Sequence, residues 1–189
     1  MTILETRRLV FRHQALSDLD RLFALYRDPE VVRYIPDAPR TYEAAREELE
    51  WHMHGHRQRP ELGLWATILK ETNTFIGRCG LLPWVIDGQA EVEVAYLIGR
   101  AYWGKGLGTE AAQAILDYGF ERLHLPRLIC LIDKDNLASM RVAQKIGMAF
   151  EKEGRDNFGP FLLYSISRPP PSDAGGGTIE DPAQRQVRG

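Results

Sequence analysis

Three alternating glycines and a lysine carry the clearest chemical signal in the sequence. In the run YWGKGLGTEA, Gly104, Gly106 and Gly108 occupy every second position, Lys105 lies between the first two, and a helical pattern follows at once. The first N–H groups of a helix have no intrahelical partner, and the helix dipole adds roughly half a positive charge at that end. Without Cβ atoms in the loop, a phosphate can approach these amides closely. The segment therefore predicts a phosphate or pyrophosphate site.

Two glutamates in the preceding run, AEVEVAYLI, could supply proton transfer. Because strand side chains alternate between faces, Glu91 and Glu93 share one face, while Val92, Val94 and Tyr96 share the other. Two like charges on one face raise the pKa of a carboxyl group, which suits a general base working near neutral pH. The pair is a candidate general base, and ordinary solvated surface glutamates are the alternative.

A succession of strands and helices must position these residues. The hydrophobic pattern predicts strands over 4–14, 63–69, 74–87, 90–99 and 126–132, with strand-like segments within 148–167. It predicts helices over 17–26, 41–56, 109–125 and 136–147. Ser17 and Thr41 are the expected N-caps of the first two helices, and Gly147 is the expected left-handed cap of the last.

Length and composition indicate one globular domain. The chain has 189 residues, of which 44% are hydrophobic and 26% charged, and a formal net charge of −2 that favours neither nucleic acid nor membrane. No apolar run approaches the ~20 residues of a membrane span, and the N-terminus is too charged for a signal peptide. We expect a cytoplasmic protein with a folded domain at 1–168 and a disordered tail at 169–189, which is rich in proline, glycine and charge.

Cysteine and histidine residues do not indicate a metal site. Cys79 and Cys130 lie in apolar runs, which favours buried reduced thiols over a disulfide or a metal site. In the run HMHGH, only His52 and His56 share a helix face, and Glu48 is the nearest acidic partner. A partly exposed helix end is favoured over a metal centre, so no metal is expected.

A second motif also fits the glycine loop. Gly106, Gly108 and Ala111 satisfy G-x-G-x-x-[GA], and Asp133 follows near a strand end, as in dinucleotide-binding domains. The strand before such a motif is normally an uninterrupted apolar run, whereas this one carries two glutamates, and few strand–helix units remain downstream. A tight loop that holds no ligand is a further alternative.

The run YLIGRAYWGKGLGTEAAQAIL, followed by NLASMRVAQKIGM, resembles the GNAT superfamily of acyl-CoA-dependent N-acyltransferases. It is most similar to the branch that includes ribosomal-protein N-terminal acetyltransferases, and the resemblance covers residues 1–168. The family's loop pattern is [QR]-x-x-G-x-[GA], and Trp103 replaces the Gln or Arg. The resemblance implies an α/β fold with a mixed, mostly antiparallel central sheet, helices on both faces, and a strand at 90–99 that splays from its neighbour at 126–132.

The resemblance also implies acetyl-CoA as co-substrate. The pantetheine arm would lie between the splayed strands against Leu97 and Ile98, and Asn136 matches a position that contacts the cofactor from the next turn. The pyrophosphate would lie on the loop and the first helical turn, which comprise Trp103, Gly104, Lys105, Gly106, Leu107, Gly108 and Thr109.

The same resemblance suggests catalytic roles. Glu93 best matches the family's glutamate and is the expected general base, with Glu91 as the second candidate. Many relatives carry a tyrosine acid seven residues after the asparagine, but this chain has Ala143 there. Ser139 matches a serine of the branch that could hydrogen-bond the sulfur, although it could equally cap backbone N–H groups.

The predicted activity is acetyl transfer from acetyl-CoA to a primary amine, by direct attack in a ternary complex. The acceptor is a protein N-terminus or a small-molecule amine, and the chain is a monomer or a homodimer. The missing tyrosine leaves a non-catalytic acyl-CoA-binding module as one alternative. A dinucleotide-binding oxidoreductase is the other.

Overall fold

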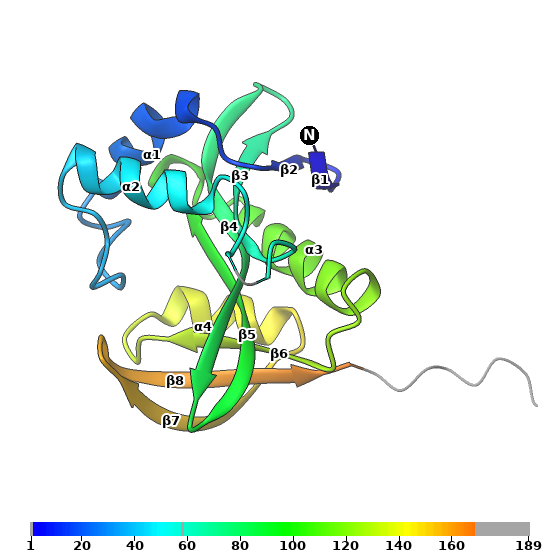
Figure 1. The fold of residues 1–189 in the computed structure, drawn as a ribbon. Helices are drawn as coiled ribbons and strands as arrows, with labels where there is room; N and C mark the ends of the chain where they lie inside the picture. Colours follow the sequence, from blue (N-terminus) through cyan, green and yellow to red (C-terminus); the bar gives the residue numbers. More distant parts are fainter. Residues whose placement is uncertain (1, 58, 169–189) are drawn as a thin grey trace, which may run out of the picture.

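The computed structural model describes residues 2–57 and 59–168, so the predicted tail at 169–189 lies outside the described residues. Eight strands form one sheet in the order β1-β2-β3-β4-β5-β6-β8-β7. Figure 1 shows β4 and β5 running steeply through the molecule, whereas β6, β8 and β7 run nearly horizontally across its lower half. This change of direction divides the sheet into two parts that meet at β5 and β6.

The first part is an antiparallel meander of five strands. It comprises β1 (Thr2–Glu5), β2 (Leu9–Arg12), β3 (Gly63–Leu69), β4 (Thr74–Ile86) and β5 (Gln89–Ile98). The expectation of a single strand over 4–14 is wrong. The backbone N–H of Thr6 donates to the carbonyl of Leu9, and this turn divides the segment into β1 and β2.

The second part contains β6 (Arg127–Ile132), β7 (Ala149–Asp156) and β8 (Gly159–Ser167). Strands β5 and β6 are parallel, and Glu93 with Ile129 is the one residue pair in register between them. Beyond that pair the two strands separate, as the predicted splay requires. Among the described residues this is the one parallel strand pair, so the doubly wound sheet of a dinucleotide-binding domain is absent from them.

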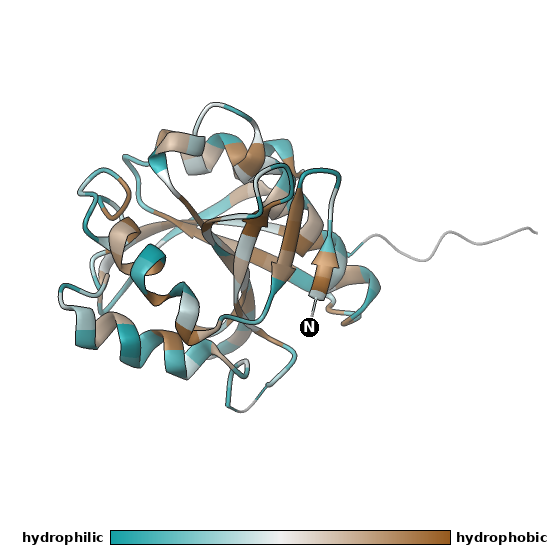
Figure 2. Cartoon of the chain, turned by 90° about the horizontal axis from the view of Figure 1, so that it is seen from above, coloured by the Kyte–Doolittle hydropathy of each residue, from teal (hydrophilic) through white to brown (hydrophobic). Residues whose placement is uncertain are grey.

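Helices cover both faces of the sheet. Helices α1 (Leu19–Tyr26) and α2 (Tyr42–His52) pack with Ala66, Ile68, Phe75 and Leu97 on one face. Helices α3 (Leu107–Glu121) and α4 (Leu137–Lys145) pack on the other face, where the largest apolar cluster lies. Figure 2 shows mainly hydrophobic strands between these helices. Cys79 and Cys130 are buried free thiols in that cluster, as expected.

Two of the three expected helix caps are present. The Thr41 hydroxyl accepts the N–H of Ala44 at 3.1 Å, and Gly147 has a φ of 86° at the end of α4. The expectation for Ser17 is wrong, because Ser17 lies exposed in a short 3-10 turn (η1, Leu16–Asp18). The buried Asp18 carboxylate accepts the N–H of Ala15 at 2.9 Å instead and binds the Arg12 guanidinium.

His52 ends α2 and is buried, whereas His54, just beyond the helix, is exposed, so the helix end is partly exposed as expected. Burial, and after it the charge of Arg78, lower the pKa of His52 to about 3, so the imidazole is neutral. Within residues 2–57 and 59–168, no group of three or more His, Cys, Asp and Glu side chains is arranged to hold a metal ion. Over the same residues, no helix has both the length and the apolar character that a membrane crossing requires.

Candidate active site

The glycine loop joins the end of β5, through a 3-10 turn (η2, Arg100–Tyr102), to α3. Gly104 and Gly106 both have a φ of 74°, a conformation that glycine adopts without strain. The first backbone hydrogen bond of α3 runs from Glu110 N–H to Gly106 C=O at 3.0 Å, so the N–H groups of residues 107–109 precede the intrahelical ladder. A Cβ added to Gly104 or Gly108 would meet no atom within 4 Å. These amides therefore border open space, which fits an anionic ligand.

Two side chains hold the start of this loop. The Trp103 indole N–H donates to the carbonyl of Ile98 at 2.6 Å, so it ties the loop to the end of β5. The Lys105 ammonium lies 5.6 Å from the centre of the Tyr102 ring. Trp103 thus has a structural contact at the position where the family pattern has Gln or Arg.

We call the space between Val94–Ile98 of β5 and Leu131–Ile132 of β6 the β5–β6 gap. The thiol of Cys130 donates to the carbonyl of Val94 at 3.2 Å, so the Val94 backbone faces this gap. Successive strand residues direct their backbone groups to opposite sides, so Tyr96 and Ile98 also face it. The Leu97 carbonyl points at β4, where a Cβ on Gly77 would meet it at 1.9 Å. A ligand in the gap would therefore meet the backbone of Tyr96 rather than that of Leu97.

Glu93 lies where the two strands begin to separate. Its Oε2 accepts the indole N–H of Trp84 at 2.7 Å, and its Oε1 accepts the backbone N–H of Leu131 at 3.3 Å. Burial raises the pKa of Glu93 to about 7, although these two hydrogen bonds lower it. The charges of Asp156 and Asp37 raise the pKa further. A half-buried carboxyl group with such a pKa can accept a proton near neutral pH.

Glu91 has a different partner. Both of its oxygens accept the Arg127 Nε–H at 3.1 Å, and Arg127 also binds Glu151 at 2.8 Å. Repulsion from Glu91 was expected to raise the pKa of Glu93. The effects that raise this pKa are instead burial and, after it, the charges of Asp156 and Asp37. The expected cause was wrong because the Arg127 guanidinium balances the charge of Glu91.

Helix α4 follows β6 and is bonded to β5. The Asn136 side-chain oxygen accepts the N–H of Ser139 at 3.1 Å, so Asn136 caps the helix and Ser139 contributes a capped N–H. The Tyr96 hydroxyl donates to the carbonyl of Ser139 at 3.2 Å, which links β5 to α4. Burial raises the pKa of Tyr96, so its phenol stays protonated. Ala143 is fully buried against the core.

The sequence did not indicate that Trp84 bonds Glu93 or that Tyr96 bonds α4. Trp84 lies opposite Glu91 in the β4–β5 register, two pairs from the Leu82–Glu93 pair, so its indole reaches Glu93 diagonally. Strand alternation placed Tyr96 on the face opposite the two glutamates. That placement is consistent with its bond to α4, and no other feature of the sequence indicated this bond.

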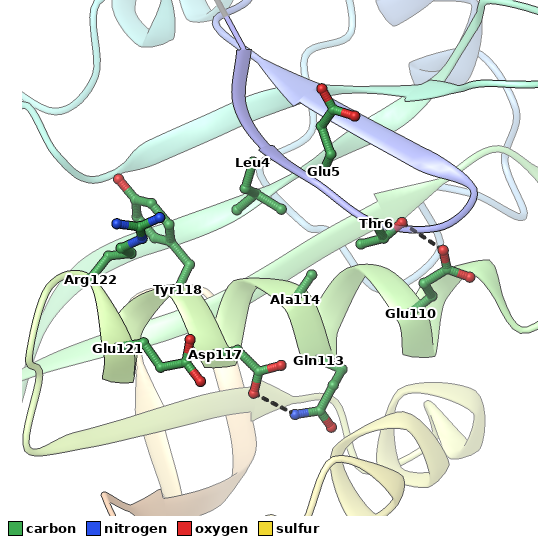
Figure 3. Close-up of a pocket in the computed structure, with 10 residues that line it drawn as sticks. All are labelled: Leu4, Glu5, Thr6, Glu110, Gln113, Ala114, Asp117, Tyr118, Glu121 and Arg122. Atoms are coloured by element: carbon green, nitrogen blue, oxygen red, sulfur yellow. Dashed lines mark hydrogen bonds between the residues drawn. The ribbon is translucent and has the colours of Figure 1, made fainter.

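A surface hollow elsewhere on the molecule does not suit an anionic cofactor. It lies between β1 and the outer side of α3, and Figure 3 shows Thr6 bonded to Glu110 at one end of it. Its charged lining consists of Glu5, Glu110, Asp117, Glu121 and Arg122. Four carboxylates against one guanidinium would repel a pyrophosphate.

Comparison with known sequences identifies the family. The model of the family described as an acetyltransferase (GNAT) domain matches residues 8–149. The protein YkkB of Bacillus subtilis is 38% identical over 171 residues, which cover 86% of this chain and 94% of YkkB. The N-acetyltransferase p20 of Bacillus licheniformis is 33% identical over 82% of this chain and 85% of p20. Spermidine N(1)-acetyltransferase of Escherichia coli is 39% identical over 68 residues, which cover 36% of each chain.

Solved structures share the fold. A GNAT-family acetyltransferase from Bacillus anthracis superposes with a TM-score of 0.75 at 26% identity, covering 88% of this chain and 98% of that one. RimL, a ribosomal L7/L12 alpha-N-protein acetyltransferase solved in complex with coenzyme A, gives a TM-score of 0.72 at 16% identity, with 89% and 98% coverage. The expected mixed sheet with helices on both faces is confirmed by this likeness.

Proposed function

The chain belongs to the GNAT acetyltransferase family, and from that premise we propose that it transfers the acetyl group of acetyl-CoA to a primary amine by direct attack in a ternary complex. One observation carries the proposal. A carboxyl group with a pKa of about 7 lies where β5 and β6 separate, on the strand that leads into an open glycine loop at a helix N-terminus. The carboxyl group suits an amine substrate, and the glycine loop suits a pyrophosphate.

The residues present fit acetyl-CoA. The glycine amides and the first turn of α3 would hold the pyrophosphate, with Lys105 adding a positive charge. The pantetheine arm would lie in the β5–β6 gap against the backbone of Tyr96 and Ile98. RimL, which has the same fold, was solved with coenzyme A. Bound there, acetyl-CoA supplies an activated thioester.

Glu93 would act on the amine. A free primary amine is mostly protonated at pH 7 and must lose a proton before it attacks. Each oxygen of Glu93 accepts one hydrogen bond, which leaves a further lone pair for the amine proton or for an intervening water. Trp84 and Leu131 fix the carboxylate, so its orientation is set before the substrate binds. The ammonium group would first give one proton to Glu93, directly or through the water. The neutral nitrogen would then bond to the acetyl carbon, the C–S bond would break to release the thiolate, and the nitrogen would lose its second proton to solvent.

The leaving thiolate would form near α4. Ser139 lies there, on the part of α4 that the Tyr96 hydroxyl ties to β5, and the N-terminus of the helix favours negative charge. A thiolate is a tolerable leaving group, so hydrogen bonding without full proton transfer is sufficient. This arrangement accounts for catalysis with Ala143 in place of a tyrosine acid.

The acceptor is proposed to be a cationic amine. Asp156 and Asp37 place negative charge near Glu93. The carboxylate of Asp156 is held by the N–H groups of Phe158 and Gly159 in the β7–β8 hairpin. Such charges attract a substrate that carries a second positive group. A partial relative is named a spermidine acetyltransferase, which supports a polyamine, and a protein N-terminus is the alternative.

Release of free thiol from acetyl-CoA tests the proposal. The purified protein is incubated with polyamines, aminoglycosides, amino acids and N-terminal peptides, and thiol formation is followed against a control without amine. We expect turnover to depend on an amine and to be highest with a polyamine. Gly106→Val is the matched control, because it strains the backbone and obstructs the amides. Binding of acetyl-CoA without thiol release for any amine would favour the non-catalytic module.

A further inference from the structure

The turn between β1 and β2 is tied to the first turn of α3. The Thr6 hydroxyl donates to Glu110 Oε1 at 2.6 Å, a contact drawn in Figure 3. The backbone N–H of Arg8 donates to the same oxygen at 2.9 Å, and the Arg8 Nε–H donates to Glu110 Oε2 at 2.6 Å. Burial would raise the pKa of Glu110, but the hydrogen bonds from Thr6 and Arg8 outweigh it and lower that pKa. Glu110 therefore stays a carboxylate that fixes the Arg8 side chain.

The same guanidinium reaches the glycine loop. Arg8 Nη1 donates to the backbone carbonyl of Lys105 at 2.9 Å, and a Cβ on Gly106 would lie 3.6 Å from Arg8 Nη2. In a trans peptide the C=O and the following N–H point in opposite directions. With the Lys105 carbonyl directed at Arg8, the N–H of Gly106 points away from Arg8.

This bond also removes an unfavourable group from an anion site. A carbonyl oxygen carries a partial negative charge and would repel a phosphate if the peptide plane turned over. Gly104 and Gly106, on either side of Lys105, are the residues that would most readily permit such a rotation. The bond from Arg8 therefore holds the Lys105–Gly106 peptide in one orientation between two flexible glycines.

We propose that Arg8 is a positioning residue for the pyrophosphate, acting through the Lys105 carbonyl to keep the loop amides directed at the cofactor. The inference rests on the proposed function, because it assigns a role within the same site. Arg8 itself contacts the loop and Glu110. Its removal should weaken cofactor binding and leave the acetyl-transfer step intact.

Arg8→Gln is the test variant, and Arg7→Gln is the matched control because Arg7 is exposed on the same turn. We expect Arg8→Gln to raise the Kd for coenzyme A and the KM for acetyl-CoA roughly 10-fold, the size of one charge-assisted hydrogen bond, with kcat within about 2-fold. Arg7→Gln should change neither. Arg8→Lys can still bind Glu110 but lacks the second donor arm, so an intermediate Kd is expected.

S-acetyl-pantetheine separates positioning from general loss of structure, because it lacks the pyrophosphate. Its rate of acetyl transfer, measured at a fixed subsaturating concentration, should be equal in the wild type and in Arg8→Gln. An equal loss with both donors, or an unchanged Kd for coenzyme A in folded Arg8→Gln, overturns the inference. If Arg8→Gln does not fold, Arg8→Lys replaces it. A raised Kd for coenzyme A in Arg8→Lys supports the inference, and an unchanged Kd overturns it. A wild-type protein that neither binds coenzyme A nor consumes acetyl-CoA refutes the proposed function instead.

Discussion

Glu91 and Glu93 extend from the same strand two residues apart, but different neighbours surround their carboxylates. Glu91 binds a guanidinium, Arg127, which is itself shared with Glu151. Glu93 binds an indole and a backbone amide, which orient it without supplying a full opposite charge. Burial raises the pKa of Glu93 to about 7, more than these two hydrogen bonds lower it. Two carboxylates on one face of one strand therefore differ in their partners, and the one without a cationic partner is the candidate base.

The largest expected effect of this difference is on turnover. Glu93→Gln should lower kcat at pH 7 by roughly 10²- to 10⁴-fold, as expected for loss of a general base, because glutamine cannot accept the amine proton. Glu91→Gln should stay within about 3-fold. The rates are measured from thiol release with one good acceptor at saturating acetyl-CoA.

Higher pH should partly rescue Glu93→Gln, because more of the amine is then neutral. Its affinity for coenzyme A serves as the control and should barely change. Wild-type kcat in Glu93→Gln at pH 7 would exclude Glu93 as the base. A selective collapse in Glu91→Gln would transfer the role to Glu91.

The two variants should also change stability in opposite directions at pH 8. The folded-state pKa of Glu93, about 7, lies above the ordinary pKa of 4.5 for a glutamate, so the native wild type loses stability as the pH rises from about 4.5 to 7. Glu93→Gln avoids this loss and should be more stable than wild type by at most roughly 3 to 4 kcal/mol, because each pKa unit corresponds to roughly 1.4 kcal/mol. Glu91→Gln loses its bond to Arg127 and should be about 1 kcal/mol less stable.

Urea denaturation at pH 5 and pH 8 measures both changes. The advantage of Glu93→Gln over wild type should be small at pH 5 and larger at pH 8. A constant difference at both pH values would show that the folded state does not raise the pKa of Glu93.

Removal of the indole donor should shift the pH profile by a smaller amount. Trp84 stabilises the charged form of Glu93, so Trp84→Phe should raise the pKa of Glu93 further, by about one unit. The rise of kcat/KM with pH should then move to higher pH, which a series of buffers at constant ionic strength would detect. Trp51→Phe is the control, since Trp51 is exposed on α2. A shift to lower pH would contradict the assigned hydrogen bond.

The smallest expected effect follows from removing the cation beside Glu91. Arg127→Met keeps most of the side-chain volume and leaves the charge of Glu91 unbalanced. The apparent pKa in kcat/KM should rise by a few tenths of a unit, about the size of a screened interaction between charges near the surface, and kcat at pH 7 should stay within about 3-fold. A shift above roughly one unit would mean that Glu91 and Glu93 titrate as a coupled pair.

Local patterns in the sequence predicted most of the elements. Alternation of side chains located β5 and placed both glutamates on one face, and the helical period located α3 directly after the glycine loop. Thr41 and Gly147 acted as caps because their effects depend on neighbours within a few residues. Ser17 was misassigned because Asp18, the next residue, offered a carboxylate and a bond to Arg12. The division of 4–14 into two strands depended on the turn at Thr6, which alternation alone does not reveal.

The sequence by itself determined the family, the order of the elements, the open glycine loop and the two candidate carboxylates. Tertiary structure decided which neighbours those groups received. Trp84 reaches Glu93 through the register of β4 with β5, Arg127 reaches Glu91 across the β5–β6 contact, and Arg8 reaches Lys105 from a turn 97 residues earlier in the chain. Periodicity reports which face a side chain occupies, but pKa values and peptide orientations depend on atoms within a few ångströms. Those atoms come from distant segments, whose register and packing are set only when the whole sheet forms.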